Sequence, residues 1–492
     1  MSNPVKPTLF NTTVFNTLGK IVFYLFIFFT SYFTSRSLSK AAFGEIQYIM
    51  LIINLSWLFL NLGFPNVLGR NFAQAFLNQH VKGLYKLIRY AVLAMGITLG
   101  MSIGVLLFLF LNNLAVTNMG IIIILGCSQI LLSYLQVLVQ SVYAYKKVFI
   151  INIMVAVVGI SFLIIGLPRY GASAYIYTYL LVNGLLCLGY GSTVFIAVKT
   201  MKVLPKAKHF ELPTTKAIYK TSLYFGVSAI LATIVWQRFE LSILKEYVDY
   251  SELAIYTIAF SVLSLFMEPL KLATGSLLYY FAGIAHHKEQ ASLTFEKFFK
   301  HFSWLVIFIG VFIYFNAEQI VTLIYTYKYV ESALYLKILL VGMVPGTCSY
   351  VIMNMHVGLG KSRFLLAQDI VCALLFLIGL YIGIQNNGLM GAAWAKSIVI
   401  LLSVALGLWY TSFRLGFKVP YLSLLKAIAL TFLLIAPFQG VLENSILFLF
   451  GKGALLFALY FALSWYLHLI DRTLVKDTLN RSKKAFTGLL AR

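Results

Sequence analysis

Charged side chains, and acidic ones above all, are scarce in this chain. Charged residues make up 11% of the 492 residues and Asp and Glu together number 15, whereas 61% of the residues are hydrophobic. A soluble domain is roughly one quarter charged and about half apolar. The composition therefore excludes a soluble globular protein and indicates a chain that lies mostly within a membrane.

Cysteine is rare, with four residues, and extended polar segments are lacking. No polar tract is long enough for a separate domain, and no Ser-His-Asp, paired-carboxylate or metal-binding pattern is present. His286 and His287 fall together in a polar turn, where we interpret them as solvated. We predict no catalytic residue, no metal and no cofactor. Four cysteines inside apolar runs are interpreted as small buried hydrophobic residues: Cys127, Cys187, Cys348 and Cys372.

Long apolar runs fill most of the sequence. They are about 18–25 residues long, the length that a helix needs to cross ~30 Å of hydrocarbon, and they lack the alternation of β-barrel strands. Because every backbone amide in lipid must be satisfied internally, each run predicts a helix, and the chain is predicted to be an all-α polytopic membrane protein. The first run has no cleavage site after it and is expected to be retained. The fourteen predicted spans lie near residues 15–35, 46–68, 86–111, 118–141, 149–167, 173–197, 219–241, 252–281, 301–317, 335–357, 364–384, 389–411, 424–442 and 447–469.

Basic residues are distributed unevenly along the chain. Most of the 38 Lys and Arg residues fall in alternate turns or in the two terminal segments, on one side of the predicted membrane. Cytoplasmic segments of membrane proteins carry such an excess. We therefore predict that both termini are cytoplasmic. The same bias accounts for the net charge of +23 without a nucleic-acid partner.

The sequence also repeats itself at an offset of roughly 210–217 residues, which indicates the duplication of a six-span unit. YKKVF at 145–149 matches GKSRF at 360–364, Gly171 matches Gly388, and Gly44 matches Ala254. Since six is even, both copies enter the membrane in the same orientation. Parallel copies are related by an axis along the membrane normal, with a cavity between them.

This duplication divides the chain into five predicted segments. Residues 1–200 form a first lobe and residues 219–415 a second, joined by a cytoplasmic loop at 201–218. Residues 416–470 supply two further spans, and residues 471–492 form a basic tail. The tail is either an amphipathic helix on the anionic inner leaflet or a solvated segment.

Four stretches carry a resemblance to a known family. They are RSLSKAAFGEIQY between the first two spans, NLGFPNVLGRNFAQA closing the second, GKSRF after the tenth and NNGLMGAAWA opening the twelfth. With the span count and the repeat, they resemble the Wzx-type polysaccharide flippases of the multidrug/oligosaccharidyl-lipid/polysaccharide exporter superfamily. The motifs are loose, consisting of small residues and turns, but the resemblance in layout covers the whole chain.

The resemblance implies a fold and an activity. The fold is a V of two six-helix lobes that opens alternately to each side of the bacterial inner membrane. The cargo is an oligosaccharide on undecaprenyl pyrophosphate, which moves from the inner to the outer leaflet for the synthesis of surface polysaccharides such as the O-antigen of lipopolysaccharide. Implied partners are this glycolipid, membrane lipids and other proteins of polysaccharide assembly. Two additional C-terminal helices are also found in peptidoglycan-precursor flippases of this superfamily.

Basic residues within or beside the spans are candidates to bind the pyrophosphate, because Lys and Arg suit phosphate as a point charge or a fork. A charge at mid-bilayer costs roughly 2.5–3.5 kcal/mol, which favours an interior position. Three alternatives stay open: a salt bridge from Lys271 to Glu268, snorkelling or a Glu240 pair for Arg238, and membrane orientation alone for the two residues near the cytoplasmic face. The candidates are Lys271, Arg238, Lys396, Arg70 and Lys20.

Three acids lie within apolar runs and are candidates for coupling to H⁺ or Na⁺: Glu268, Asp369 and Glu240. Glu268 is the deepest and precedes Pro269, which should kink its helix. The alternative is that Glu268 only balances the cationic cavity. The membrane potential alone favours outward movement of an anion by ~2.3 kcal/mol per charge per 100 mV, so coupling is not required.

Aromatic residues offer surfaces for stacking on sugars. The candidates for glycan contact are Trp236, Trp394 and Tyr175, with Tyr177 and Tyr179 beside them. For each of them, packing or a place in the interfacial aromatic belt is the favoured alternative.

Three other functions compete with the oligosaccharide flippase. A lipid II flippase differs only in its cargo. An O-antigen polymerase or ligase should carry a large external loop with catalytic basic residues, whereas the outward turns here are short. A drug or cation antiporter of the same superfamily should have an acidic cavity, whereas bases outnumber acids within these spans.

Overall fold

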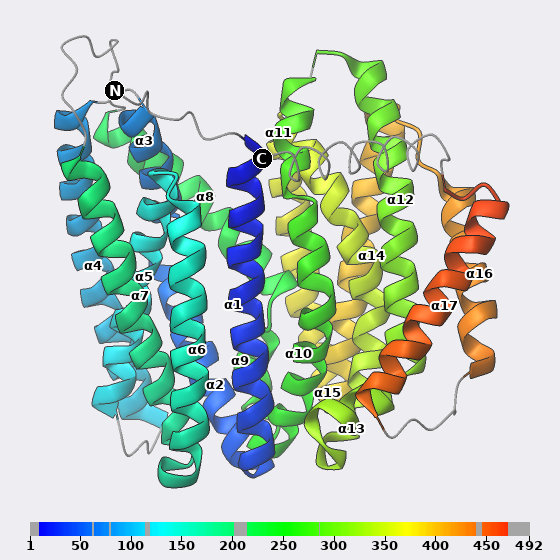
Figure 1. Cartoon of the computed structure of the whole chain (residues 1–492), viewed down its shortest axis with the longest axis horizontal. Coiled ribbons are helices and arrows are strands. Elements are labelled where there is room, and N and C mark those ends of the chain that lie inside the picture. The colour runs from blue at the N-terminus through cyan, green and yellow to red at the C-terminus, as the bar shows by residue number, and fades with distance from the viewer. Residues whose placement is uncertain are drawn as a thin grey trace, which may run out of the picture. The chain divides into compact units, whose positions relative to one another are not determined.

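The structure is a computed structural model that describes residues 9–61, 63–77, 80–113, 119–200, 214–284, 286–438 and 445–470. Every regular element in these ranges is helical (Figure 1). Most of the predicted loop 201–218 and the whole predicted tail 471–492 lie outside the described residues. The α-helices are α1 (Leu9–Ser37), α2 (Lys40–Asn61), α3 (Phe64–Leu77), α4 (Val81–Asn113), α5 (Met119–Ser141), α6 (Tyr145–Tyr170), α7 (Ser173–Lys199), α8 (Thr215–Trp236), α9 (Glu240–Leu244), α10 (Tyr250–Ala273), α11 (Gly275–Gly283), α12 (Lys288–Phe315), α13 (Ala317–Tyr325), α14 (Ser332–Gly358), α15 (Ser362–Trp409), α16 (Tyr421–Ile435) and α17 (Ile446–Tyr466). Shorter turns are η1 (Tyr327–Tyr329), the π-helix η2 (Tyr410–Arg414) and η3 (Ala436–Phe438).

Thirteen helices of the described chain are long and apolar enough to cross a membrane. One of them, α15, runs through a kink at Asn387 and Gly388, where the backbone leaves the helical conformation. Its 48 residues would extend about 72 Å at 1.5 Å per residue, more than twice the thickness of the hydrocarbon core. The two halves instead lie side by side, since Gln368 in the first half bonds to Ser403 in the second. The halves of α15 therefore correspond to the predicted eleventh and twelfth spans. The prediction of an all-α, multi-pass membrane protein is confirmed.

Three spans predicted as continuous are broken, and that detail of the prediction is wrong. The span at 219–241 divides after Trp236 into α8 and α9. The span at 46–68 divides at Gly63, which has a φ of 69°, into α2 and α3. The span at 252–281 divides at Thr274 into α10 and α11. The Thr274 hydroxyl donates to the carbonyl of Lys271 at 2.7 Å and so satisfies a group that the helix end leaves exposed. The sequence gives no sign of this capping, because Thr274 lies within an apolar run.

The backbone supports the duplication at two separate turns. Gly171, between α6 and α7, has φ 52° and ψ −128°, and Gly388, in the kink of α15, has φ 54° and ψ −132°. The turns that lead into α6 and α15 both contain a residue with positive φ, Tyr143 at 59° and Gly360 at 73°. In chain order, α4 to α7 then correspond to α12, α14 and the two halves of α15.

The described chain divides into two contact units. The first contains residues of Met1–Ser261 and Asp369–Ala395, and the second contains those of Val262–Gln368 and Lys396–Arg492. In the first unit, α1 packs on α6, and α7 packs on α5 and α6 (Figure 1). Its outward-facing positions on α4 are apolar and exposed, as lipid contact requires, for example at Val92, Leu93 and Ile97. The lobe boundaries proposed from the repeat stay a prediction.

In the second unit, α12 packs against α14 and α16. Hydrogen bonds and ring stacking join α17 to α12. Trp304 of α12 donates its ring N–H to Ser464 Oγ of α17 at 2.8 Å. Its ring stacks on Tyr460 with centroids 4.8 Å apart, and the Tyr460 hydroxyl donates to the carbonyl of Trp304. The two helices beyond the repeat therefore brace the second unit.

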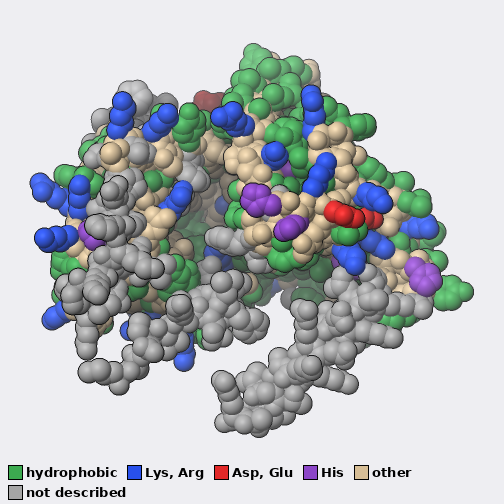
Figure 2. Space-filling model, turned by 90° about the horizontal axis from the view of Figure 1, so that it is seen from above, with side chains coloured by type: hydrophobic (Ala, Val, Ile, Leu, Met, Phe, Trp, Pro, Cys, Tyr) green, Lys and Arg blue, Asp and Glu red, His purple; other side chains and the backbone are tan. Residues whose placement is uncertain are grey.

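Exposed basic side chains gather where many of the helices begin or end. Figure 2 shows one such face of the molecule, on which Lys and Arg are many and Asp and Glu few. The exposed basic residues at helix ends include Lys82, Lys86, Lys146, Lys147, Lys220, Lys288, Lys361 and Arg363. This distribution fits the charge bias found in the sequence.

A glycine allows two helices of the first unit to touch. A Cβ atom on Gly44 of α2 would collide with the carbonyl oxygen of Tyr250 and come within 3.2 Å of the amide nitrogen of Ala254, both on α10. Gly44 and Ala254 are the two residues that the repeat pairs. The two copies therefore meet backbone to backbone at equivalent positions.

We predict that Gly44→Val destabilises the protein, because the two backbones must move apart, at a cost on the order of 1–3 kcal/mol. The measurement is the thermal unfolding midpoint of the purified protein in detergent. Gly96→Val on α4 is the control, since a Cβ there meets nothing within 4 Å. Equal midpoints for the two variants would contradict a close contact at Gly44.

Candidate functional site

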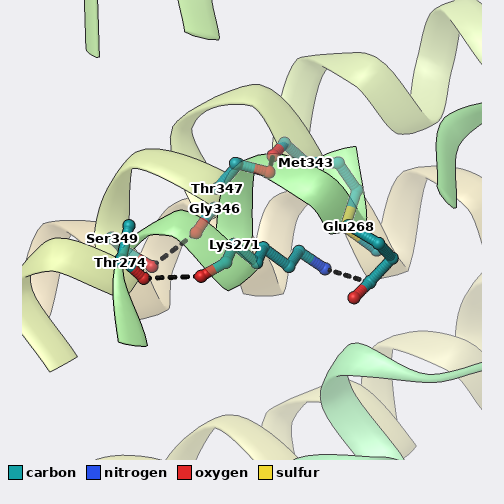
Figure 3. Close-up of polar contacts among 7 residues, drawn as sticks. All are labelled: Glu268, Lys271, Thr274, Met343, Gly346, Thr347 and Ser349. Atoms are coloured by element: carbon teal, nitrogen blue, oxygen red, sulfur yellow. Dashed lines mark hydrogen bonds and ion pairs between the residues drawn. The ribbon is translucent and has the colours of Figure 1, made fainter. Parts of the chain in front are cut away.

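An ion pair lies within α10 of the second unit. Lys271 Nζ lies 2.8 Å from Glu268 Oε1, one helical turn earlier, and the two side chains are 9% and 20% exposed. In Figure 3 the Lys271 side chain extends along the helix toward the Glu268 carboxylate. The salt bridge considered as an alternative for Lys271 is thus formed in this conformation. Such pairing lowers the cost of holding both charges within a membrane span.

Residues of α14 complete the surroundings of Lys271. Its Nζ lies 5.0 Å from the ring centroid of Tyr350, a distance at which a cation is attracted to the face of an aromatic ring. Asn354, one turn further along α14, donates to Thr274 Oγ1 at 3.0 Å. These contacts tie α14 to the break that ends α10 and hold the ammonium at a defined place.

Two prolines interrupt the helices that carry this pair. Pro269 follows Glu268 in α10, and Pro345 precedes Tyr350 in α14. A proline inside a helix cannot donate to the carbonyl four residues earlier, so both helices have a weakened turn here. Weakened turns beside a charged pair allow the two helices to bend at this point.

Arg238 lies in the interruption between α8 and α9, in the first unit. Its guanidinium carbon is 5.7 Å from the ring centroid of Phe260 on α10, and its side chain is partly buried. It is also near enough to Tyr175 and Tyr179 of α7 to interact electrostatically with both. The break in the helix therefore places a cation over the ring of Phe260 and within electrostatic range of two tyrosines.

A chain of polar groups runs through the helices beside Arg238. Gln47 of α2 donates to the Tyr175 hydroxyl at 3.4 Å, and that hydroxyl donates to Tyr179 at 3.3 Å. The Tyr179 hydroxyl lies 3.5 Å from Thr30 Oγ1 of α1. The two rings pack with centroids 4.8 Å apart, and Tyr175 is 4% exposed. A sugar could reach Tyr175 only in another conformation.

The other two acidic candidates are placed differently. Glu240 begins α9 and is 0% exposed, and its Oε1 accepts a hydrogen bond from the Tyr256 hydroxyl at 2.8 Å. Asp369 lies in the first half of α15 and is partly buried. Beside it, the Gln368 amide donates to the carbonyl and the hydroxyl of Ser403 in the second half of the same helix.

Lys396 is the most buried of the basic candidates. It lies in the second half of α15 and is 0% exposed. The next residue, Ser397, donates to the carbonyl of Ile338 on α14 at 2.8 Å, and Gly342 of α14 touches the backbone of Ser397. Lys396 therefore sits at a tight crossing of α14 and α15.

The remaining candidates lie nearer the surface. Lys20 on α1 and Arg70 on α3 are exposed. Trp394 on α15 is 43% exposed and Trp236, at the end of α8, is partly buried. The structure thus brings together Lys271 with Glu268 and Arg238 with Tyr175. Roles for all of these residues in binding cargo stay predictions.

Several polar residues at these sites were not found in the sequence. Tyr350, Thr30 and Tyr256 lie inside apolar runs with no local motif around them, and Gln47 lies in RSLSKAAFGEIQY, a stretch that indicated the family but no site. The one available signal was the spacing of Tyr175 and Tyr179, which places both rings on the same face of a helix. Contacts between distant spans cannot be read from such a pattern.

Comparisons with known proteins identify the family. A family model described as "Polysaccharide biosynthesis protein" matches residues 33–334, more than half of the chain. Among curated proteins, no match was found.

Three solved structures show the fold. "Lipid II flippase MurJ, inward closed conformation" aligns with a TM-score of 0.61 at 14% identity, covering 93% of this chain and 97% of that one. An inward-facing multidrug resistance MATE transporter of the MOP superfamily gives 0.60 at 14%, covering 82% and 94%. A MOP superfamily transporter from Pyrococcus furiosus, for which a binding pocket of reverse polarity is reported, gives 0.61 at 16%, covering 83% and 95%. The chain therefore belongs to the polysaccharide biosynthesis protein family and has the fold of the MOP superfamily, as the resemblance in its sequence predicted.

Proposed function

We propose that this protein flips an undecaprenyl-pyrophosphate-linked oligosaccharide from the cytoplasmic to the periplasmic leaflet of the bacterial inner membrane. It does so by alternating access, with both termini in the cytoplasm. The observation that carries the proposal is a lysine, Lys271, held beside a carboxylate within a membrane span of a protein from a polysaccharide biosynthesis family. A basic group in that position suits a cargo whose head is an anion that must cross the membrane.

Exchange of partners on Lys271 is the proposed binding step. A pyrophosphate oxygen replaces Glu268 as the acceptor of the hydrogen bond that Lys271 donates. The ring of Tyr350 keeps the ammonium in place. Charge-assisted hydrogen bonds of this kind are about twice as strong as neutral ones. The displaced Glu268 then either takes up H⁺ or Na⁺ or turns to solvent. The weakened helical turns at Pro269 and Pro345 permit the accompanying bend.

Arg238 is proposed as a second anion-binding group, in the first unit. Its fork of N–H donors suits two phosphate oxygens at once. The hydroxyls of Tyr175 and Tyr179 nearby can accept or donate hydrogen bonds to the same oxygens or to sugar hydroxyls. Lys396, Lys20 and Arg70 stay secondary proposals for the same role, and Trp236 and Trp394 for contact with the glycan.

The protein is proposed to be a carrier and not an enzyme. Proposed partners are the glycolipid, the surrounding lipids and other proteins of surface polysaccharide assembly. Lipid II is the second candidate cargo, because the likeness to the lipid II flippase structure extends over 93% of the chain.

We predict that Lys271→Gln slows the movement of the cargo by about 10-fold or more, since a hydrogen bond to a charged group contributes roughly 1.5–3 kcal/mol. Lys271→Arg should retain most of the rate. The measurement follows a fluorescent undecaprenyl-pyrophosphate oligosaccharide across the membrane of vesicles that contain the purified protein.

The double variant Lys271→Gln with Glu268→Gln separates binding from folding. Loss of Lys271 alone removes the ammonium that lies 2.8 Å from Glu268 Oε1 and leaves the negative charge of Glu268 in the span, and the second change removes that charge. Cargo binding by Lys271 predicts that the double variant stays slow while its unfolding midpoint recovers. A double variant that regains the wild-type rate would mean that the lysine serves only the ion pair.

Arg238→Gln is predicted to raise the cargo concentration needed for half-maximal transport, with a smaller rise for Arg238→Lys, which keeps the charge but loses the fork. The control is Lys245→Gln. Lys245 follows α9 and its Nζ lies 4.3 Å from the ring centroid of Tyr250, so the control removes a nearby charge outside the tyrosine pair. An Arg238→Gln variant that behaves like this control would contradict the assignment.

A potential that is negative on the loading side should speed transport in vesicles with no H⁺ or Na⁺ gradient. Each uncompensated negative charge that moves outward gains ~2.3 kcal/mol per 100 mV. The measurement compares initial rates with and without a potassium diffusion potential. Transport rates that do not change with the potential and depend only on an H⁺ or Na⁺ gradient would favour obligatory coupling to that ion. In that case Glu268→Gln should abolish the dependence of the rate on the ion gradient.

A further inference from the structure

An apolar cavity of about 350 Å³ lies among four helices of the second unit. Its walls come from α10, α12, α13 and α17, and the larger side chains among them are Phe266, Phe312, Ile324, Phe450 and Phe457. A volume of this size falls in the range of ligand-binding pockets. A water inside such a cavity needs two to four polar partners, and apolar walls leave it without them. The fitting occupant is a hydrocarbon chain.

A polar pair marks one edge of this cavity. Lys452 Nζ donates to Asn316 Oδ1 at 3.0 Å, and the Asn316 amide donates to the carbonyl of Phe312, a residue of the cavity wall. On α17, Lys452 directly precedes Gly453, which also lines the cavity. Asn316 joins the end of α12 to the start of α13. The lysine therefore places a positive charge beside the apolar space, where these two helices meet.

The helix that carries Lys452 is open to lipid on its other side. Leu447, Phe448 and Phe450 of α17 are 82%, 72% and 65% exposed, although all three are large and apolar. In a membrane-spanning helix such side chains face hydrocarbon. Lipids of the bilayer thus reach the edge of the cavity directly, and Phe450 belongs to both surfaces.

One of the four walls comes from outside the predicted repeat. The helix α17 follows both copies in the chain, whereas α10, α12 and α13 lie within the second copy. The cavity therefore includes a helix that the duplication does not supply.

We propose that this cavity binds an anionic phospholipid of the surrounding membrane, with one hydrocarbon chain in the apolar space and the phosphate at Lys452. Anionic lipids are recognised by basic groups set between transmembrane helices. The bound lipid joins α17 and α13 to α12 and thereby stabilises the second unit. This site is independent of the cargo and of the Lys271 pair.

The test compares two lipids with identical chains, phosphatidylglycerol and phosphatidylcholine, added to the purified full-length protein in detergent. Phosphatidylglycerol is expected to raise the thermal unfolding midpoint more than phosphatidylcholine. Lys452→Gln should abolish that difference, while its amide still donates to Asn316 and keeps the fold. Lys452→Arg should retain the difference. Ala454→Phe, which fills the cavity from α17, should remove the response to both lipids.

The matched control is Lys337→Gln. Lys337 of α14 forms an exposed salt bridge with Glu318 of α13 at 2.9 Å, so the control removes a lysine bonded to the same short helix but away from the cavity. It should keep the preference for phosphatidylglycerol. Retention of the lipid by native mass spectrometry gives a second readout that does not depend on the midpoint.

Three results would overturn the proposal. One is equal stabilisation of the wild type by the two lipids, and another is an unchanged lipid preference in Lys452→Gln. The third is stabilisation by undecaprenyl phosphate in the absence of any effect of phosphatidylglycerol, because the cavity would then hold the chain of the cargo instead of a resident lipid.

Discussion

The cost of a charge in hydrocarbon is the constraint on which this structure depends. At roughly 2.5–3.5 kcal/mol for a charge at the centre of the bilayer, an ionisable residue stays in a span only if the fold gives it a partner or an interior position. The structure provides both. Lys271 has Glu268 and the ring of Tyr350, Glu240 has the hydroxyl of Tyr256, and Lys396 is enclosed at the crossing of α14 and α15. These residues are therefore held within the protein, away from lipid.

The same constraint explains which features could be predicted from the sequence. Apolar runs of membrane-spanning length give the helices, because a helix of this kind depends on composition along one segment. The orientation that the loop charges indicate stays a prediction. The repeat was visible for a similar reason, since Gly171 and Gly388 are each required by the same left-handed turn. The ion pair of Lys271 and Glu268 follows from one helical turn of spacing.

Features that depend on contacts between spans could not be predicted. The break at Thr274 depends on one hydroxyl bond and the position of Tyr350 on the packing of α14, and neither leaves a pattern in an apolar run. The tyrosine pair shows the same limit. Spacing placed Tyr175 and Tyr179 on one face, but only the fold reveals that Gln47 and Thr30 meet them and that Arg238 lies nearby. Side-chain environment, unlike topology, is set by residues far apart in the chain.

The two copies of the repeat are not equivalent in their surroundings. Helices of the two copies meet where Gly44 approaches Tyr250 and Ala254, whereas α16 and α17 lie beyond the repeat, on the side of the second copy. These added helices brace α12 through Trp304, Tyr460 and Ser464 and enclose apolar space beside it. The added helices thus distinguish one half of the duplicated frame from the other.

The central claim is that this one protein carries a lipid-linked glycan across the membrane. Its most direct test measures the leaflet in which an undecaprenyl-pyrophosphate oligosaccharide lies, over time, in vesicles whose only protein is this chain. A fluorescent phospholipid in the same vesicles serves as the internal reference. The account predicts rapid transfer of the glycolipid while the phospholipid stays in its leaflet. Transfer of the glycolipid no faster than in protein-free vesicles would contradict it.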